Sequence, residues 1–174
     1  MTQKKSLVEY QNEINELIYN ESLQEEEQTN YLSIVLKDKH YLINLVDIKE
    51  TSTLPSISKI GRVNSWFLGI SNFRGQVNPV IDMTFIFTGK NSNYNESYAL
   101  LANPKFGTNC AMLWDGVNKL ITQKGLVKKE NVNLNELKWI KEIWIDENNI
   151  EWHEINVEQL MNCSDIFNIY KENK

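Results

Sequence analysis

The chain has 174 residues, a formal net charge of −5 at pH 7 and two cysteines. A chain of this length can bury a hydrophobic core without disulfide bonds, and it fits one domain or two fused lobes. The cysteines lack C-x-x-C spacing, and the sequence shows no signal peptide and no apolar run of ~20 residues, so we expect a cytoplasmic protein without membrane insertion. A negative net charge without a basic stripe argues against nucleic-acid binding.

The first thirty residues predict a helix followed by an acidic linker. Ser6 and Glu9 have the spacing of a capping box, which marks a helix start. The stretch ESLQEEEQTN carries like charges too densely to pack, so we expect a solvated linker up to residue 30. The sequence leaves open whether the helix packs on this chain or on a partner. The helix is predicted from about Ser6 to Asn20 because apolar residues recur there at helical spacing: Leu7, Tyr10, Ile14, Leu17 and Ile18.

From Tyr31 the apolar period changes to two, which indicates strands. We expect a first hairpin that turns at Asp38–Lys39, and then a loop over residues 51–65, which are rich in Ser, Thr and Pro. The polar half of FIFTGKNSNYNES is expected to be a second loop. Strands are predicted in these segments: YLSIVLK, YLINLVDIKE, WFLGISNF, QVNPVIDM, YALLANP, TNCAMLW, GVNKLIT, LKWIKEIWID and IEWHEIN.

The end of the chain predicts a hairpin turn and then a return to helix. Residues 146–149 are typical of a turn, and Asn156 has Gln159 three residues later, as expected at a helix start. The apolar spacing that follows fits one helix or two. Many short strands with helices only at the ends predict small barrels or a sandwich, and the sequence shows no βαβ alternation.

Catalytic chemistry finds little support in the sequence. A metal site built from His40 and His153 needs carboxylates from elsewhere, and the chain contains neither G-x-S-x-G nor G-x-x-x-x-G-K-[ST]. A small hydrolase that uses His153 and Glu151 has only their proximity in its favour. We therefore expect no catalytic, metal or cofactor site, and we interpret the chain as a binding or scaffolding module.

The segment GISNFRGQVNPVID predicts an irregular hairpin. Gly69 marks a bulge or a place where another chain segment comes close, and the side chain of Asn72 is suited to bond the backbone of the turn. Gly75 supplies the unusual backbone angle that closes the hairpin after Arg74. Pro79 cannot donate a hydrogen bond, so its strand is expected at an edge or to be irregular there.

Arg74 projects from this predicted hairpin, and Glu50 is placed where its carboxylate reaches across to it. Such a pair serves orientation more than stability. The alternative is that Arg74 only solvates the tip of a turn. Three apolar residues nearby fit either a docking surface or ordinary core: Val46, Ile48 and Leu54.

From about Tyr31 to Met161 the chain resembles the CheW family of chemotaxis coupling proteins. Four stretches carry the resemblance, in this order: YLINLVDIKE, LPSISKIGRVNSWFLGISNFRGQVNPVIDM, CAMLWDGVNKLI and WIKEIWIDENNIEWHEINVEQLM. The family pattern Gly-x-x-Asn-x-Arg-Gly, followed by Pro-x-x-Asp, is matched in order and spacing by six residues: Gly69, Asn72, Arg74, Gly75, Pro79 and Asp82. The resemblance divides the chain into an N-terminal helix and linker (1–30), a CheW-like domain (31–161) and a C-terminal helical tail (162–174).

The resemblance implies a mainly β fold of two intertwined SH3-like five-stranded β-barrels with a hydrophobic seam between them. It also implies a non-catalytic adaptor that joins the cytoplasmic tip of a methyl-accepting chemoreceptor to the regulatory domain of a CheA-type histidine kinase. The residues expected to bind the receptor are Glu50, Asn72, Arg74 and Gly75, with apolar area from Val46, Ile48 and Leu54.

Two features are similar to the type IV pilus branch of the family, the PilI-like proteins. Phe73 stands where a leucine is usual, and the N-terminal helix is an extension that is not typical of minimal couplers. This similarity implies control of type IV pili and twitching motility.

A second hypothesis is a generic SH3-like module that binds peptides and has no chemosensory role. Such modules display aromatic clusters for Pro-rich ligands. Alternation with polar neighbours favours core positions for the tryptophans that would form this cluster: Trp139, Trp144 and Trp152.

Overall fold

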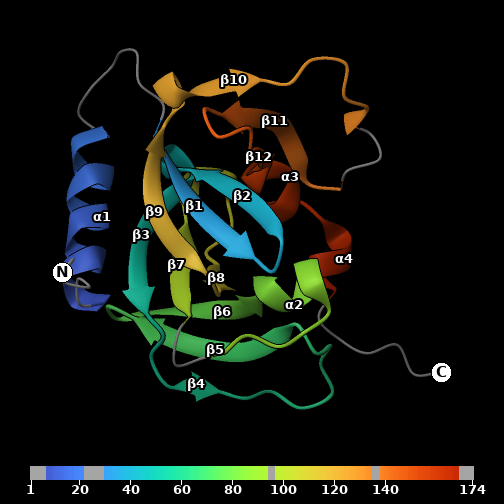
Figure 1. The fold of residues 1–174 in the computed structure, drawn as a ribbon. Helices are drawn as coiled ribbons and strands as arrows, with labels where there is room; N and C mark the ends of the chain where they lie inside the picture. The colour runs from blue at the N-terminus through green and yellow to red at the C-terminus, as the bar shows by residue number, and fades with distance from the viewer. Residues whose placement is uncertain (1–6, 22–29, 94–96, 135–137, 169–174) are drawn as a thin grey trace.

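The computed structural model describes residues 7–21, 30–93, 97–134 and 138–168 (Figure 1). The predicted capping residue Ser6, most of the acidic linker and the middle of the second loop lie outside the described residues. The helices and strands, in chain order, are α1 (Leu7–Glu21), β1 (Asn30–Leu36), β2 (Lys39–Asn44), η1 (Leu45–Asp47), β3 (Ile48–Thr53), β4 (Ile57–Ser58), β5 (Phe67–Phe73), β6 (Gln76–Asp82), α2 (Met83–Thr88), β7 (Tyr98–Ala102), η2 (Pro104–Phe106), β8 (Ala111–Trp114), β9 (Val117–Thr122), η3 (Gln123–Gly125), β10 (Leu126–Lys128), β11 (Ile140–Asp146), β12 (Glu151–Ile155), α3 (Val157–Met161) and α4 (Ser164–Phe167).

The strands form two curled sheets that are intertwined in sequence (Figure 1). The first sheet has the order β10-β11-β12-β2-β1-β9, and the second has the order β3-β7-β8-β6-β5-β4. The chain begins the first sheet, builds the whole second sheet and then returns to complete the first. This arrangement confirms the predicted mainly β fold of two SH3-like subdomains. Each sheet has six strands instead of the predicted five, because the short strands β4 and β10 each add one.

The largest hydrophobic cluster lies between the two sheets and joins them. It combines Leu32 and Ile34 of the first sheet with Ile81 and Leu100 of the second, and all four are buried. A separate small cluster packs within each sheet. The predicted hydrophobic seam between the subdomains is therefore confirmed.

The predicted strand YLINLVDIKE is broken into β2, η1 and β3. The Asn44 side chain accepts a hydrogen bond from the Val46 N–H at 3.1 Å and so starts the 3-10 turn η1. β2 belongs to the first sheet and β3 to the second. A single straight strand is therefore wrong, because the chain must turn here to pass from one sheet to the other.

Three further boundaries differ from the predictions. The first hairpin turns at residues 37–38, since Leu36 pairs with Lys39. The predicted loop over residues 51–65 contains the end of β3 and the whole of β4. The helix α2 lies in the middle of the chain, where only loop and strand were expected. Its signals are an aspartate N-cap, since Asp82 accepts the Phe85 N–H at 2.8 Å, and a left-handed Gly89 at its end.

The N-terminal helix is confirmed, and α1 packs along β3 on this chain (Figure 1). Ile14 is fully buried in the main core, which contributes about 2 kcal/mol to stability. β3 is an edge strand, and its Thr51 N–H donates to Asn15 Oδ1 at 3.1 Å while Gln11 Nε2 donates to the Thr51 carbonyl at 3.1 Å. The helix thus satisfies backbone groups that an open sheet edge would leave unpaired.

At the other end of the chain, the apolar stripe forms two helices, α3 and α4, on the side of the molecule opposite α1 (Figure 1). Asn156 Oδ1 accepts the Gln159 N–H at 2.9 Å, which confirms the predicted cap. Ile166 of α4 is buried in the main core, and its carbonyl accepts a hydrogen bond from Trp66 Nε1 at 3.2 Å. The first residues of the predicted C-terminal tail therefore pack on the domain.

Candidate docking surface

The tip of the β5–β6 hairpin is a two-residue turn. Phe73 pairs with Gln76, and the loop residues Arg74 and Gly75 have φ angles of 49° and 84°. Two consecutive positive φ angles define a type I′ turn, whose twist matches that of the flanking strands. Asn72 Oδ1 accepts the Gly75 N–H at 2.7 Å. The turn-stabilising roles predicted for Asn72 and Gly75 are confirmed.

The base of the same hairpin confirms the prediction for Gly69 and refines the one for Pro79. A Cβ atom at Gly69 would lie 2.3 Å from the Ser58 carbonyl oxygen, and the register shifts between Phe67 and Gly69. β6 as a whole is an inner strand, between β5 and β8. Its pairing with β8 starts at Val80, so within the described residues Pro79 is paired with β5 alone. Proline has no backbone N–H to donate, and because Pro79 is not paired with β8, no hydrogen bond between β6 and β8 is lost.

Arg74 forms the expected ion pair with Glu50. Nη1 of Arg74 lies 3.2 Å from Oε2 of Glu50, and the two side chains are 75% and 14% exposed. A pair with one partner so open to water stabilises a fold by about 1 kcal/mol at most. The contact therefore orients the guanidinium over β3 more than it strengthens the fold.

The backbone of Arg74 indicates that turn stability does not explain the arginine. A left-handed conformation costs a residue with a Cβ about 1 kcal/mol, and asparagine and glycine are favoured at this turn position. From this turn the arginine side chain extends to the carboxylate of Glu50. This geometry is suited to presenting a cation to a partner.

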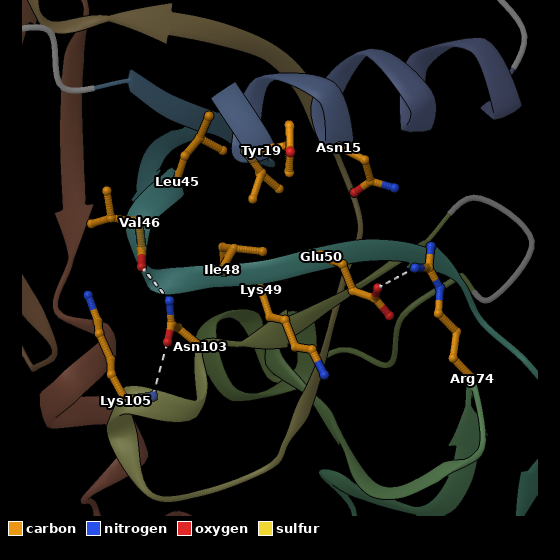
Figure 2. A pocket seen from close by; sticks show the side chains of 11 residues that line it. Asn15, Tyr19, Leu45, Val46, Ile48, Lys49, Glu50, Arg74, Asn103 and Lys105 are labelled. Atoms are coloured by element: carbon orange, nitrogen blue, oxygen red, sulfur yellow. Dashed lines mark hydrogen bonds and ion pairs between the residues drawn. The ribbon is translucent and has the colours of Figure 1, made fainter. Parts of the chain in front are cut away.

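A groove with a volume of about 610 Å³ runs beside this pair, between α1 and β3 (Figure 2). Arg74 and Glu50 lie at one end of it, and Lys105 lies near the other end. Leu45, Val46 and Ile48 supply apolar area on the side of η1 and β3, and Ile18 and Tyr19 supply it on the side of α1. The residues that line it are Asn15, Ile18, Tyr19, Leu45, Val46, Ile48, Lys49, Glu50, Arg74, Asn103 and Lys105.

Polar contacts hold the Lys105 end of the groove in place. Asn103 Nδ2 donates to the Val46 carbonyl at 3.0 Å, and Asn103 Oδ1 accepts the Lys105 N–H at 3.0 Å (Figure 2). Lys105 Nζ lies 2.6 Å from Asp47 Oδ1. These bonds tie η2 to η1, so both ends of the groove carry an arginine or lysine that is positioned by a carboxylate.

The structure separates the three apolar residues predicted near Arg74. Val46 is 48% exposed and lines the groove. Ile48 also lines the groove but is 1% exposed, so it belongs to the core and forms a floor instead of a free apolar surface. Leu54 does not line the groove, and it packs partly buried against the small cluster of the second sheet.

Several groove residues were not predicted from the sequence. Ile18 and Tyr19 come from α1, and no pattern in the sequence places this helix next to β3. Asn103 and Lys105 follow β7, which is the neighbour of β3 in the sheet. For Lys49 the sequence did carry a signal. It stands between Ile48, which is buried, and Glu50, so alternation along the strand places its side chain outside the core.

The residues considered for catalysis do not form a metal site. His153 Nδ1 lies 3.2 Å from the carbonyl oxygen of His40, and the described part of the chain contains no group of three or more His, Cys, Asp or Glu side chains able to hold a metal ion. Glu151 is paired with Lys129, and this hydrogen bond lowers the pKa of the Glu151 carboxyl. Glu151 therefore remains a charged surface group.

The tryptophans considered for peptide binding are covered. Trp144 and Trp152 are buried, and their indole N–H groups donate to Glu154 at 2.7 Å and to Asp146 at 3.0 Å. Trp139 is partly buried and packs against the main core. These positions confirm the core interpretation. None of the helices in the described ranges is both long and apolar enough to cross a membrane.

Fold and site together define a two-subdomain SH3-like β protein with a surface groove between α1 and β3, and its described residues include no group of side chains able to hold a metal ion. The model of the CheW-like domain family matches residues 30–164, and the chain belongs to this family. Among solved structures, it is similar to the scaffolding protein TtCheW from Thermoanaerobacter tengcongensis, with a TM-score of 0.65 and 20% sequence identity. That match covers 79% of this chain and 95% of TtCheW, and at this identity it supports the fold alone.

Proposed function

We propose that the protein is a non-catalytic adaptor that couples chemoreceptor cytoplasmic tips to a CheA-type histidine kinase in the cytoplasm. Membership of the CheW-like family supports the coupling role. The observation that carries the docking surface is Arg74, held in a left-handed turn and paired with Glu50 at the end of a groove. One face takes an amphipathic helical hairpin of the receptor, and another packs against the homologous regulatory domain of the kinase.

Association in solution tests this function. The purified full chain is mixed with a receptor-tip fragment and with a kinase regulatory domain from the same genome, and the mixture is separated by size exclusion. We expect a ternary complex that contains all three proteins. A chain that associates with neither partner would overturn the coupling function.

Replacement of Arg74 tests the docking surface separately. Asparagine is favoured at this turn position, so Arg74→Asn removes the guanidinium without straining the hairpin. We expect receptor-fragment affinity to fall about tenfold, as for an arginine that contacts the partner directly, while the thermal unfolding midpoint stays unchanged. Lys37→Asn is the matched control, because Lys37 also has a positive φ angle at a hairpin turn, outside the groove. A large loss of stability in Arg74→Asn would make Arg74 a structural residue.

We further propose that the receptor pathway is the one that controls type IV pili and twitching motility. The features that support it are Phe73 in the hairpin and the helix α1 ahead of the family-matched region. A deletion strain is expected to lose twitching on surfaces and to regain it when the gene is restored. Normal twitching together with lost flagellar chemotaxis would reject the pilus assignment and leave the adaptor role intact.

A further inference from the structure

The groove has one wall that lies outside the shared family domain. The family match begins at residue 30, whereas α1 ends at Glu21. Nevertheless Asn15, Ile18 and Tyr19 of α1 line the groove together with η1 and β3 (Figure 2). The shape of the groove in this chain is therefore set partly by a segment that the family match does not include.

We propose that α1 is a fixed wall of the docking groove and selects which receptor helix binds there. This inference rests on the proposed function and specifies the partner surface for that same site. The partner is an amphipathic helix whose apolar stripe packs between Tyr19 of α1 and Val46 of η1. Tyr19 is 65% exposed and Val46 is 48% exposed, so both offer apolar area to a partner.

Burial and hydrogen bonding argue that α1 stays in place when the partner binds. Ile14 is fully buried in the main core, and Asn15 and Gln11 bond the edge backbone of Thr51. A partner that displaced α1 would expose Ile14 and leave the edge of β3 unpaired. The groove is already open beside the helix, so a partner can enter without that displacement.

The charges of the groove indicate an acidic partner helix. Three cations line the groove, Lys49, Arg74 and Lys105, although the whole chain has a net charge of −5. Arg74 and Lys105 are paired with the carboxylates of Glu50 and Asp47, which leaves Lys49 as the cation in excess. Lys49 is exposed, and its Nζ donates to the neutral Gln76 side chain at 3.2 Å, so no carboxylate neutralises it in this contact. Carboxylates at the flanks of the partner's apolar stripe would complement these cations.

Point variants of the full chain test the wall without deleting the helix. The probe is a soluble helical-hairpin fragment of a chemoreceptor cytoplasmic tip encoded in the same genome, and affinity is measured by calorimetry at low and high salt. Tyr19→Ser removes the wall's aromatic ring, and Tyr19→Phe retains it. Val8→Ser is the matched control, because Val8 is an exposed apolar residue of α1 about 16 Å along the axis from Tyr19 and outside the groove lining.

We expect Tyr19→Ser to weaken binding about tenfold, and Tyr19→Phe and Val8→Ser to change it by less than about twofold. Affinity is expected to fall at high salt, and Lys49→Gln to reduce that dependence. Binding that does not respond to salt would contradict the proposal that the partner helix is acidic. Unchanged thermal midpoints show that each variant is folded.

The outcomes separate this inference from the proposed function. If Tyr19→Ser binds with wild-type affinity and Arg74→Asn binds more weakly, α1 is not a wall of the binding site, and the docking surface at Arg74 stands. Tighter binding in Tyr19→Ser would mean that α1 obstructs the partner, and it would also contradict the role of α1 as a wall. Wild-type affinity in both variants would reject the docking surface itself.

Discussion

Arg74 combines an unfavourable backbone conformation with an ion pair at one end of the groove. Its positive φ angle is unfavourable for an arginine, yet the side chain is aimed at Glu50 across 3.2 Å. Strained residues cluster at functional sites, where the surrounding structure holds them. Here the Asn72 side chain and the flanking strands supply that support.

Gly69 is a position of the second sheet at which a side chain does not fit. Its φ angle is +135°, and an added Cβ would lie 2.3 Å from the Ser58 carbonyl and 2.9 Å from Ile57 Cγ2. We expect Gly69→Ala to lower the free energy of unfolding by about 3 kcal/mol, because backbone strain and a steric clash add together. Gly61→Ala is the control, since Gly61 has open space around it, and it should stay within about 0.5 kcal/mol. Urea unfolding followed by tryptophan fluorescence measures both variants, and equal stabilities would contradict the close approach.

Glu154 is a buried carboxylate that organises the first sheet. Its side chain is 2% exposed and accepts hydrogen bonds from Tyr31 Oη at 3.3 Å, Trp144 Nε1 at 2.7 Å and Lys141 Nζ at 2.9 Å. We expect Glu154→Gln to cost about 3 kcal/mol, because the amide cannot accept from all three donors and leaves Lys141 without its partner.

The matched control for Glu154 lies directly opposite in the sheet. Glu142 pairs in register with Glu154, but it is more exposed and its partner is the open side chain of Lys128. Glu142→Gln should therefore cost less than about 1 kcal/mol in the same urea titration. A similar cost for the two variants would show that burial does not decide the difference.

At the scale of elements, the docking of α1 on β3 closes a sheet edge with side chains. Thr51 is fully buried, and its N–H has Asn15 Oδ1 as acceptor in place of a neighbouring strand. We expect Asn15→Ala to lower the free energy of unfolding by about 1–2 kcal/mol, the cost of a buried donor without an acceptor. Hydrogen exchange should show faster exchange at the Thr51 amide. Asn12→Ala, at an exposed position of the same helix, should change neither quantity, and a protected Thr51 amide in Asn15→Ala would contradict this role.

Two aspartates tie the middle of the chain to the second sheet in a similar way. Asp82 caps α2 and also accepts the Ser92 N–H at 3.0 Å, and Asp115 accepts the Asn93 N–H at 3.0 Å. Asp82 belongs to the family pattern that the sequence matched. Its position here explains that match as a structural cap, in contrast to the exposed Arg74 of the same pattern.

At the scale of the whole molecule, the groups with raised pKa values predict a loss of stability in alkali. Burial raises the pKa of Cys110 to about 12, and burial together with the carboxylate of Glu154 raises the pKa of Tyr31. The hydrogen bond to Glu154 raises the pKa of Lys141. These groups bind protons more tightly in the folded chain, so their contribution is complete below their unfolded pKa values, about 8.5 to 10.4.

We therefore expect the free energy of unfolding to be level from about pH 7 to 8 and to fall as the pH rises from about 9 toward 12. Tyr31 and Lys141 lie in the first sheet and Cys110 immediately precedes β8 of the second, so both subdomains should lose stability together. Urea titrations across this range measure the effect, and Cys110→Ala should reduce its slope. Constant stability up to pH 11 would contradict the prediction.

The sequence by itself determined the local features, because their causes lie within a few residues. Alternation predicted most strands, glycine at positions 69 and 75 predicted the bulge and the turn, and Asn156 predicted the start of α3. It also predicted that Glu50 reaches across to Arg74, beside the alternative that Arg74 only solvates the tip of a turn. The break of the second strand at η1 carried a local signal in Asn44, but strand periodicity hid it.

Only the tertiary structure decided which surfaces are exposed and which segments meet. Val46 and Ile48 look alike in sequence and both line the groove, yet Val46 is exposed and Ile48 is buried. The reason is that Val46 lies in the turn η1 on the surface, whereas Ile48 starts β3 and packs into the main core between the two sheets. The wall from α1 is likewise a long-range contact, fixed by the burial of Ile14 and the open edge at Thr51. Such contacts depend on how the sheets fold on one another, and no local pattern encodes that arrangement.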